Sequence, residues 1–165
     1  MTHAELFQLF TEDQRDREAM PPFPSPEAEA MLARDRARLA RVEQIVADGG
    51  AVDAEDCFHA ALVCQHGPEL ADIERAHELA RRAVALDATH ASARRLVCAS
   101  EDRLLRRRGL PQRWGTQFIV GADGVWALEP LDGSVDDAER ERQGLPSIAE
   151  QLARAERESR RTRQA

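Results

Sequence analysis

Apolar side chains recur at helical spacing along the chain as far as about residue 110. The first predicted helix covers residues 3–19, where Leu6 and Phe10 begin a stripe along one face that Asp13 and Arg17 continue. Such a stripe predicts a helix that buries its first half and carries a carboxylate and a guanidinium toward the interior. The alternative is an exposed Asp13–Arg17 ion pair at i, i+4, which stabilises a helix by only about 0.2–0.5 kcal/mol.

A proline-rich connector at residues 20–26 ends the first helix, because proline cannot continue a helix. Four more helices are predicted after it. Capping residues and glycines delimit these helices. The second begins after Ser25 and ends at Gly49-Gly50, the third is capped by Asp53 and ends at Gln65-His66-Gly67-Pro68, the fourth covers 69–87, and the fifth is capped by Thr89 and ends at Gly109. The inward seam of the second helix is expected to hold Leu32, Leu39, Val42 and Val46.

After residue 110 the pattern changes from helical spacing to alternation. Residues 116–120 and 125–128 flank a glycine-bounded turn, which predicts a β-hairpin over about 115–128. A short helix over 136–143 and a last helix from Ser147 complete the chain, and its charged end at 151–165 is expected to fray. We therefore expect a mainly α fold in one domain over residues 1–165. It should be a single bundle of about six to seven helices with the two-stranded hairpin packed on its side.

The amino-acid composition favours helices and excludes some classes of binding partner. Aromatic residues make up only 4% and Tyr is absent, so Ala and Leu must do most of the packing. The net charge of −7 disfavours binding to nucleic acid or to anionic membranes. All 23 basic residues are Arg, which is typical of a high-GC bacterial genome, so a Schiff-base lysine is excluded and every cationic site is a planar fork. No apolar run approaches membrane-spanning length and the N-terminus lacks signal-peptide features, so a cytoplasmic protein is expected.

The cysteine and histidine patterns indicate neither a disulfide framework nor a metal site. Cys57, Cys64 and Cys98 lack paired spacing and are expected to be buried, reduced thiols. The sequence has no CxxC spacing and no HExxH. It also lacks GxSxG, a phosphate loop and a dinucleotide fingerprint, so we expect neither a metal nor a cofactor.

Several polar residues stand where a solvated surface would more often carry Glu, Lys or Arg. They form a series along the chain: Asp13-Gln14-Arg15-Asp16-Arg17, Gln65-His66, Asp102-Arg103, Gly109-Leu110-Pro111-Gln112-Arg113-Trp114-Gly115-Thr116-Gln117, Asp136 with Arg140, and Gly144-Leu145. With this series the chain resembles an uncharacterised bacterial family, a domain of unknown function. The pattern of that family is Asp-Gln-x-x-Arg, Gln-His, Asp-Arg, Gly-x-Pro-Gln-x-aromatic-Gly-Thr-Gln, Asp-x-x-x-Arg and Gly-Leu. The resemblance covers nearly the whole chain and implies a shared fold without an established activity.

Two departures from this pattern affect the chemistry. Trp114 stands where the family more often has Tyr, so a phenol is absent there. Gly67-Pro68 follows Gln65-His66 where many members have Ala-Asp, so an acidic neighbour of the histidine is missing. A second, more local resemblance is to tetratricopeptide repeats, in residues 76–87. Three units of fixed period are absent, so this likeness implies a helical hairpin only.

The polar series suggests a site for an anionic ligand. We expect His66 as acid–base, helped by Asp13 and Asp102, because a helix C-terminus favours the imidazolium. The expected ligand-binding residues are Gln14, Arg17, Gln65, Arg103, Gln112, Trp114, Thr116, Gln117, Asp136 and Arg140. His66 and Arg103 should converge, and the 112–117 loop should line the same concavity. The alternative for His66 is a structural histidine bonded to a helix-end carbonyl.

Three functions fit these residues. The first is a small bacterial enzyme acting on a carboxylate- or phosphate-bearing metabolite or peptide. The second is a non-catalytic binding module that recognises an acidic ligand through the same groups. The third is a helical adaptor or immunity-type interaction protein, suggested by the repeat-like helices and the Arg-rich end. The expected partner is an anionic small molecule or acidic peptide rather than nucleic acid or membrane, and the chain is a candidate homodimer.

Overall fold

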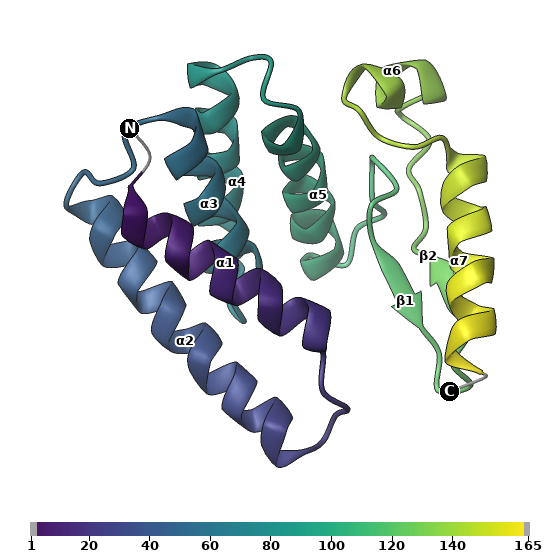
Figure 1. The fold of residues 1–165 in the computed structure, drawn as a ribbon. Coiled ribbons are helices and arrows are strands. Elements are labelled where there is room, and N and C mark those ends of the chain that lie inside the picture. Colours follow the sequence, from purple (N-terminus) through teal and green to yellow (C-terminus); the bar gives the residue numbers. More distant parts are fainter. Residues whose placement is uncertain (1–2, 164–165) are drawn as a thin grey trace. The chain divides into compact units, whose positions relative to one another are not determined.

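A computed structural model describes residues 3–163 and shows a mainly helical chain with one two-stranded antiparallel sheet (Figure 1). Within these residues the elements are α1 (Ala4–Ala19), α2 (Pro26–Ala47), α3 (Ala54–Gln65), α4 (Leu70–Leu86), α5 (Ala91–Arg107), β1 (Phe118–Val120), β2 (Trp126–Leu128), α6 (Asp137–Arg142) and α7 (Ile148–Thr162). The chain divides into two compact units, residues 1–96 and 97–165, with the boundary inside α5. The expectation of one domain over the whole chain stays a prediction.

The helix starts follow from local capping, with one correction. Ser25 accepts a hydrogen bond from the backbone N–H of Ala28, and Asp53 forms a reciprocal capping box with Asp56, as the sequence predicts. The predicted cap of α5 at Thr89 is wrong. The Nδ1 atom of His90 accepts the Ala93 N–H at 3.2 Å, whereas Thr89 donates its hydroxyl to a carboxylate that precedes it.

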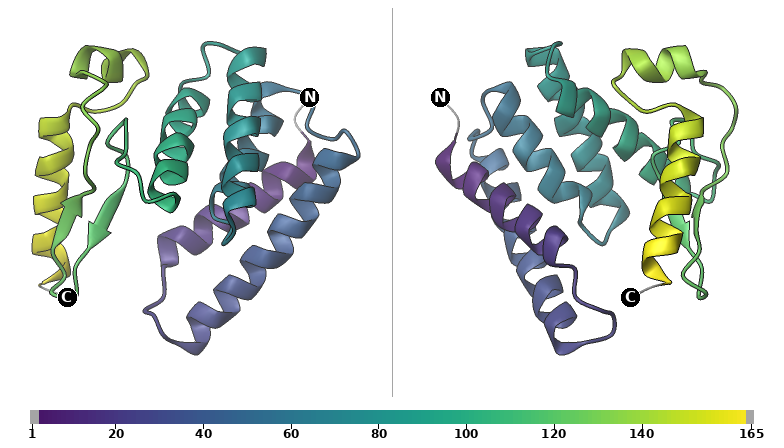
Figure 2. Two further views of the ribbon diagram at one scale, coloured as in Figure 1. Left: turned by 180° about the vertical axis from the view of Figure 1, so that it is seen from behind. Right: turned by 45° about the vertical axis from the view of Figure 1, so that its right-hand side comes forward.

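The first unit is built around α3, which packs against α1, α2 and α4. Many of the buried side chains of α3 and α4 are small, so these two helices can approach closely; they include Cys57, Ala60, Ala61, Cys64, Ala76, Ala80 and Ala83. Figure 2 shows α1 lying beside α2 on one side of this unit. The predicted α2 seam is partly wrong, because Leu32 is 41% exposed while Met31 and Arg38 are buried. The α2 seam runs instead through Ala28, Met31, Asp35, Arg38, Val42 and Ile45, at alternating spacings of three and four.

The second unit contains the predicted hairpin, which is shorter than expected. Strand β1 pairs with β2 so that Phe118 faces Leu128 and Val120 faces Trp126. Residues 116 and 117, expected in the first strand, belong to the preceding loop. Strand β2 packs against α7 (Figure 2). Packing of the hairpin against the earlier helices stays a prediction, and residues 164–165 of the segment expected to fray lie outside the described residues.

The cysteines are free and buried, as the sequence predicts. Burial raises the pKa of the Cys98 thiol to about 12, and it raises the pKa of Cys64 as well, so neither thiol is a ready nucleophile. No helix within residues 3–163 is long and apolar enough to cross a membrane.

Candidate functional site

His66 stands at the C-terminal end of α3, where the chain turns sharply into α4. Its backbone N–H donates to the carbonyl of Val63, and Gly67 then donates to Cys64. A Cβ atom on Gly67 would overlap the side chain of Asp72, so glycine allows this close turn. The imidazole is 21% exposed, which leaves one of its edges open to solvent.

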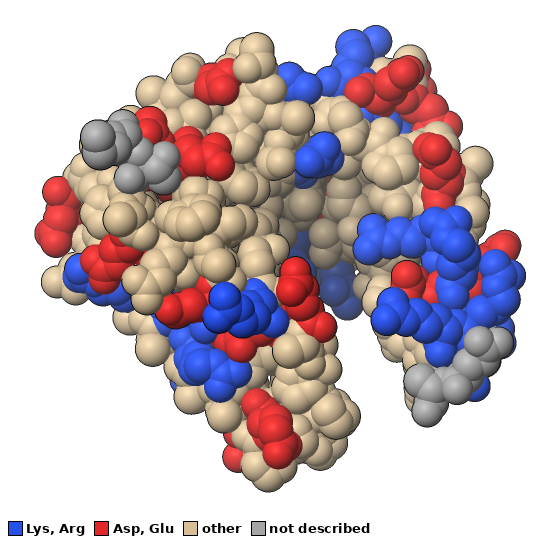
Figure 3. Space-filling view, in the orientation of Figure 1, with Lys and Arg blue, Asp and Glu red and all other residues tan. Residues whose placement is uncertain are grey.

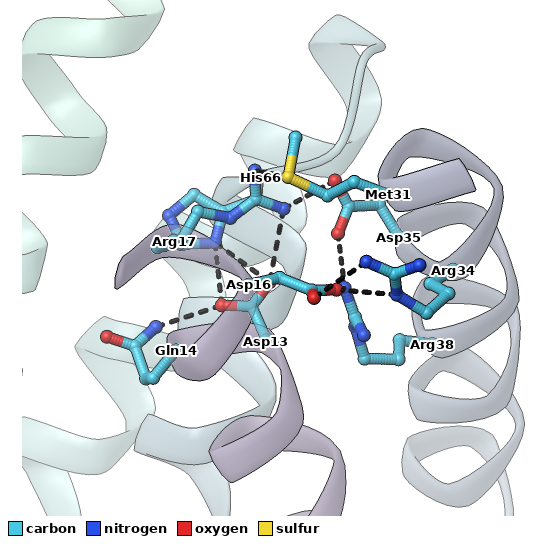
Figure 4. Close-up of polar contacts among 9 residues, drawn as sticks. All are labelled: Asp13, Gln14, Asp16, Arg17, Met31, Arg34, Asp35, Arg38 and His66. Carbon is cyan, nitrogen blue, oxygen red and sulfur yellow. Dashed lines mark hydrogen bonds and ion pairs between the residues drawn. The ribbon is translucent and has the colours of Figure 1, made fainter. Parts of the chain in front are cut away.

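The imidazole of His66 is held by a buried carboxylate from α1 (Figure 4). Asp13 is 1% exposed, and its Oδ2 and Oδ1 atoms lie 2.8 and 3.1 Å from Nδ1 of His66. Because an ionised carboxylate only accepts hydrogen bonds, Nδ1 carries the proton of the neutral ring. None of the hydrogen bonds within residues 3–163 uses Nε2, so that atom is available to a ligand. The structural alternative, a bond to a helix-end carbonyl, is therefore not what holds this ring.

Two further α1 side chains converge on Asp13. Gln14 donates from Nε2 to Oδ2 at 2.9 Å, and Arg17 lies 3.5 Å from Oδ1. The burial of Asp13 excludes the simple exposed Asp13–Arg17 pair considered from the sequence. Arg17 also forms a close ion pair with Asp35 of α2. Several donors thus stabilise a buried negative charge that would otherwise be costly.

The α2 side of the cluster was missed by the sequence analysis. Arg38, which is 5% exposed, donates to Asp16 at 2.6 Å and to Asp35 at 2.5 Å. Arg34 holds Asp16 through two parallel bonds of 3.0 and 2.8 Å. The bonds from Arg34 and Arg38 lower the pKa of Asp16 to about 2. The available signal was the spacing of Met31, Asp35 and Arg38, which places two charges on the apolar seam of α2.

The charges within this cluster nearly cancel. Arg17, Arg34 and Arg38 balance three aspartates, so the charge on His66 decides whether the cluster is neutral or positive (Figure 4). Arg17 was expected as an anion clamp, but its terminal nitrogen is engaged by Asp13 and Asp35. Its Nη1 lies 4.0 Å from the sulfur of Met31, and its Nε is buried without a partner. Because the two aspartates already neutralise this guanidinium, the imidazolium of His66 is the better anchor.

The remaining predicted residues lie at the end of α3 or in the second unit. Gln65 precedes His66 in the sequence, is the last residue of α3 and is buried. Asp102 of α5, expected to be catalytic, is fully buried and accepts backbone N–H bonds from Arg113, Trp114 and Thr116 at 2.7, 2.8 and 3.0 Å. It also accepts the Thr116 hydroxyl at 2.8 Å. Both oxygens of Asp102 are therefore used to fold the loop, and we assign it a structural role.

The amides of the loop are engaged in the same way. Gln112 accepts the N–H of Gln117 at 2.8 Å and donates to the carbonyls of Gln117 and Glu129. The amide of Gln117 donates to the Ala99 carbonyl and to Thr116. Trp114 is 7% exposed, and its indole N–H donates to Glu101 at 2.6 Å. These contacts give the Gly-Thr-Gln block a clear role in shaping its own loop.

Asp136 and Arg140 also support this part of the second unit. Asp136 caps α6 by accepting the backbone N–H of Glu139 at 2.8 Å. Arg140 is fully buried and donates through Nε and Nη2 to the carbonyl of Pro146. Its Nη1 lies 2.8 Å from the place where a Cβ on Gly115 would stand, so only glycine fits there. Burial lowers the pKa of Arg140 from its ordinary value.

The structure thus brings Asp13, Gln14, Arg17 and His66 together in the first unit. It gathers Asp102, Gln112, Thr116 and Gln117 around the loop of the second, where Arg103 follows Asp102 on α5. The predicted convergence of His66 with Arg103, and with the 112–117 loop, joins residues of different units and stays a prediction.

Neither a metal centre nor a known relative identifies the site. Within residues 3–163, no three His, Cys, Asp or Glu side chains are grouped so that they could hold a metal ion. No family model matches the chain, and no curated protein or solved structure shows significant similarity to it.

Proposed function

We propose that the chain is a small enzyme in which His66 and Asp13 form an acid–base pair acting on an anionic metabolite or peptide. One observation carries the proposal: Nδ1 of a partly exposed imidazole lies 2.8 Å from a buried carboxylate. That contact fixes the orientation of the ring and leaves Nε2 as the atom that exchanges a proton. Asp13 stabilises the imidazolium that forms when Nε2 accepts a proton.

The chemistry assigned to the pair is a proton transfer in two directions. In the first, Nε2 of His66 removes a proton from a substrate X–H or from an attacking water. In the second, the imidazolium returns that proton to the leaving or rearranged group, so the residue ends as it began. Positioned general acid–base groups of this kind contribute about 10²–10⁴-fold to a rate.

The charge of the cluster supports an anionic substrate. Three arginines are neutralised by three aspartates, so an added proton on His66 gives the cluster a net positive charge. The imidazolium formed by the proton transfer then attracts the negative charge of a substrate carboxylate or phosphate, while its Nε2–H stays directed at the group that takes the proton back. In this account Arg17 holds Asp13 and Asp35 in place and does not clamp the substrate.

A non-catalytic binding module for an acidic ligand is the second candidate. The nine residues of the cluster include no Ser, Thr or Cys that could act as a nucleophile (Figure 4). A binding module needs no nucleophile, whereas a hydrolase built on this pair would rely on water. Turnover separates the two candidates, because both use the same contacts to recognise the ligand.

The test is a comparison of His66→Gln with His90→Gln in the full chain. His90 is a matched control, since its Nε2 also lies 2.8 Å from a carboxylate, that of Glu55, which stands at the opposite end of α3 from His66. A mixture of carboxylate- and phosphate-bearing metabolites is incubated with each protein and its composition followed by mass spectrometry. We expect wild type and His90→Gln to consume the same compound and His66→Gln to lose at least about 10²-fold in rate. Equal turnover by both variants contradicts the proposal, and saturable binding without turnover favours the binding module.

A further inference from the structure

A groove in the second unit lies between strand β2 and helix α7, and its volume is about 510 Å³. That volume lies within the usual range for small-molecule sites, about 300–1,000 Å³. Its lining comes from Val125, Trp126, Ala127 and Leu128 of the hairpin and from Leu152, Ala155, Glu156, Ser159, Arg160 and Arg163 of the C-terminal segment. The groove contains no residue of the His66 cluster, so it is a separate feature of the molecule.

The two walls of the groove run in opposite directions. The backbone N–H of Trp126 donates to Ser159 at 2.8 Å, and its indole N–H donates to Thr162 at 3.1 Å. The residue before the strand, Gly124, faces Thr162 and the stem of Arg163. The start of β2 therefore lies beside the end of α7, and the opposite end of the groove is formed by Leu128 and Leu152.

One end of the groove is apolar because α7 packs through small residues. Ala155 and Ser159 are buried against the hairpin, and their short side chains bring the helix close to the strand. The larger Leu152 remains 49% exposed at this end, and Val125, toward the other end, remains 36% exposed. These side chains leave apolar surface that nothing within residues 3–163 covers.

The other end is basic. Within residues 3–163, neither Arg160 nor Arg163 forms an ion pair, whereas Arg161 on the outer side of the helix pairs with Glu158. Figure 3 shows basic side chains gathered over this part of the molecule. Glu156 also lines the groove, one helical turn before Arg160, so the positive charge is greatest toward the end of α7.

We propose that this groove binds a small amphipathic carboxylate, such as a medium-chain fatty acid. The apolar chain lies between Leu152 and the hairpin, and the carboxylate is held by the guanidinium groups of Arg160 and Arg163. The distance along α7 from Leu152 to Arg160 is about 12 Å at the helical rise, which suits a chain of this size. The assignment does not depend on the function proposed for His66.

The experiment follows the indole and backbone N–H signals of Trp126 by NMR in the ¹⁵N-labelled full chain while octanoate is added. We expect saturable shifts confined to the groove residues. Arg160→Gln/Arg163→Gln should weaken binding by about tenfold or more, through loss of two charge-assisted bonds. Leu152→Ser should also weaken binding, since it removes the apolar wall. The matched control is Arg161→Gln, which changes an exposed arginine that does not line the groove and should leave the affinity unchanged.

Two further ligands decide the chemistry. Octan-1-ol should bind more weakly than octanoate, and octyltrimethylammonium should not saturate the groove, because the head-group site is cationic. The proposal is overturned if octanoate gives no saturable shift, if the cationic amphiphile binds equally well, or if Arg161→Gln weakens binding as much as the double variant. It is also overturned if the chain binds phosphatidylglycerol vesicles but not free octanoate, since the arginines would then serve a membrane surface.

Discussion

At the scale of single residues, two buried aspartates show how the surroundings of a carboxylate define its role. Asp13 and Asp102 are both about 1% exposed or less. Asp102 accepts only loop groups that have no chemistry of their own, namely backbone N–H groups and the Thr116 hydroxyl. Asp13 instead holds the imidazole of His66, whose second nitrogen is available to a ligand. The sequence suggests both as catalytic, and only their hydrogen-bond donors distinguish them.

Asp102→Asn should therefore affect stability rather than chemistry. The Asn amide group would replace one accepting oxygen with a donor that faces loop N–H groups, at a cost of about 2–3 kcal/mol. We expect a lower midpoint in urea unfolding, and a turnover per folded molecule equal to that of wild type. A large loss of turnover with unchanged stability would return Asp102 to the catalytic residues.

The lowered pKa of Asp16 predicts how the stability of the first unit changes in acid. Bonds from Arg34 and Arg38 lower the pKa of Asp16 to about 2, below the 3.8 expected of the unfolded chain. The unfolded chain therefore takes up this proton first as the pH falls, so the contribution of Asp16 to stability is present above about pH 4 and is lost toward pH 2. We expect about 1–2 kcal/mol, allowing for its partial exposure.

The measurement is urea unfolding of wild type and Asp16→Asn between about pH 6 and pH 2. Wild type should be the more stable protein at the upper end of this range, and its advantage should shrink on acidification. An advantage that stays constant or grows as the pH falls would show that the two arginines do not hold Asp16 in this way.

At the scale of elements, the end of α3 determines where the imidazole stands. Gly67 allows α4 to begin immediately after His66, because a larger residue would overlap Asp72. The sequence identifies Gly67-Pro68 as a helix stop, and this boundary is confirmed. The tight packing beneath it comes from a side chain five residues later, which a stop signal does not reveal.

Gly67→Ala should destabilise the protein by about 1–3 kcal/mol through overpacking against Asp72. It should also move the NMR signals of the His66 ring, since that ring is attached to the displaced turn. Gly121→Ala is the comparison, because its added methyl would overlap the end of the Asp123 side chain and loosen that side chain's bond to the Val125 N–H, in the hairpin turn rather than beside His66. A Gly67→Ala protein with the melting temperature of wild type and with unchanged NMR signals of the His66 ring would contradict this account of the turn.

At the scale of the whole molecule, the sequence predicts local features well and long-range ones poorly. Helix boundaries and the hairpin follow from caps, glycines and periodicity, which act over a few residues. The sequence places Leu32 inward because it is apolar, but the seam that α2 buries runs through the charged residues Asp35 and Arg38 instead. His66 and Asp13 were both predicted as site residues, but their contact spans 53 positions and depends on how α1 packs on α3. Spacing along one helix carries no information about such a contact.

The claim that His66 and Asp13 act as one unit is tested most directly by a double-mutant cycle on turnover. The cycle compares His66→Gln, Asp13→Asn and the double variant, using the compound that wild type consumes and correcting each rate for the folded fraction. If Asp13 acts only through the imidazole, the double variant should be no slower than His66→Gln, which itself loses about 10²-fold or more. Losses that multiply in the double variant, or a His66→Gln protein as active as wild type, would contradict the account.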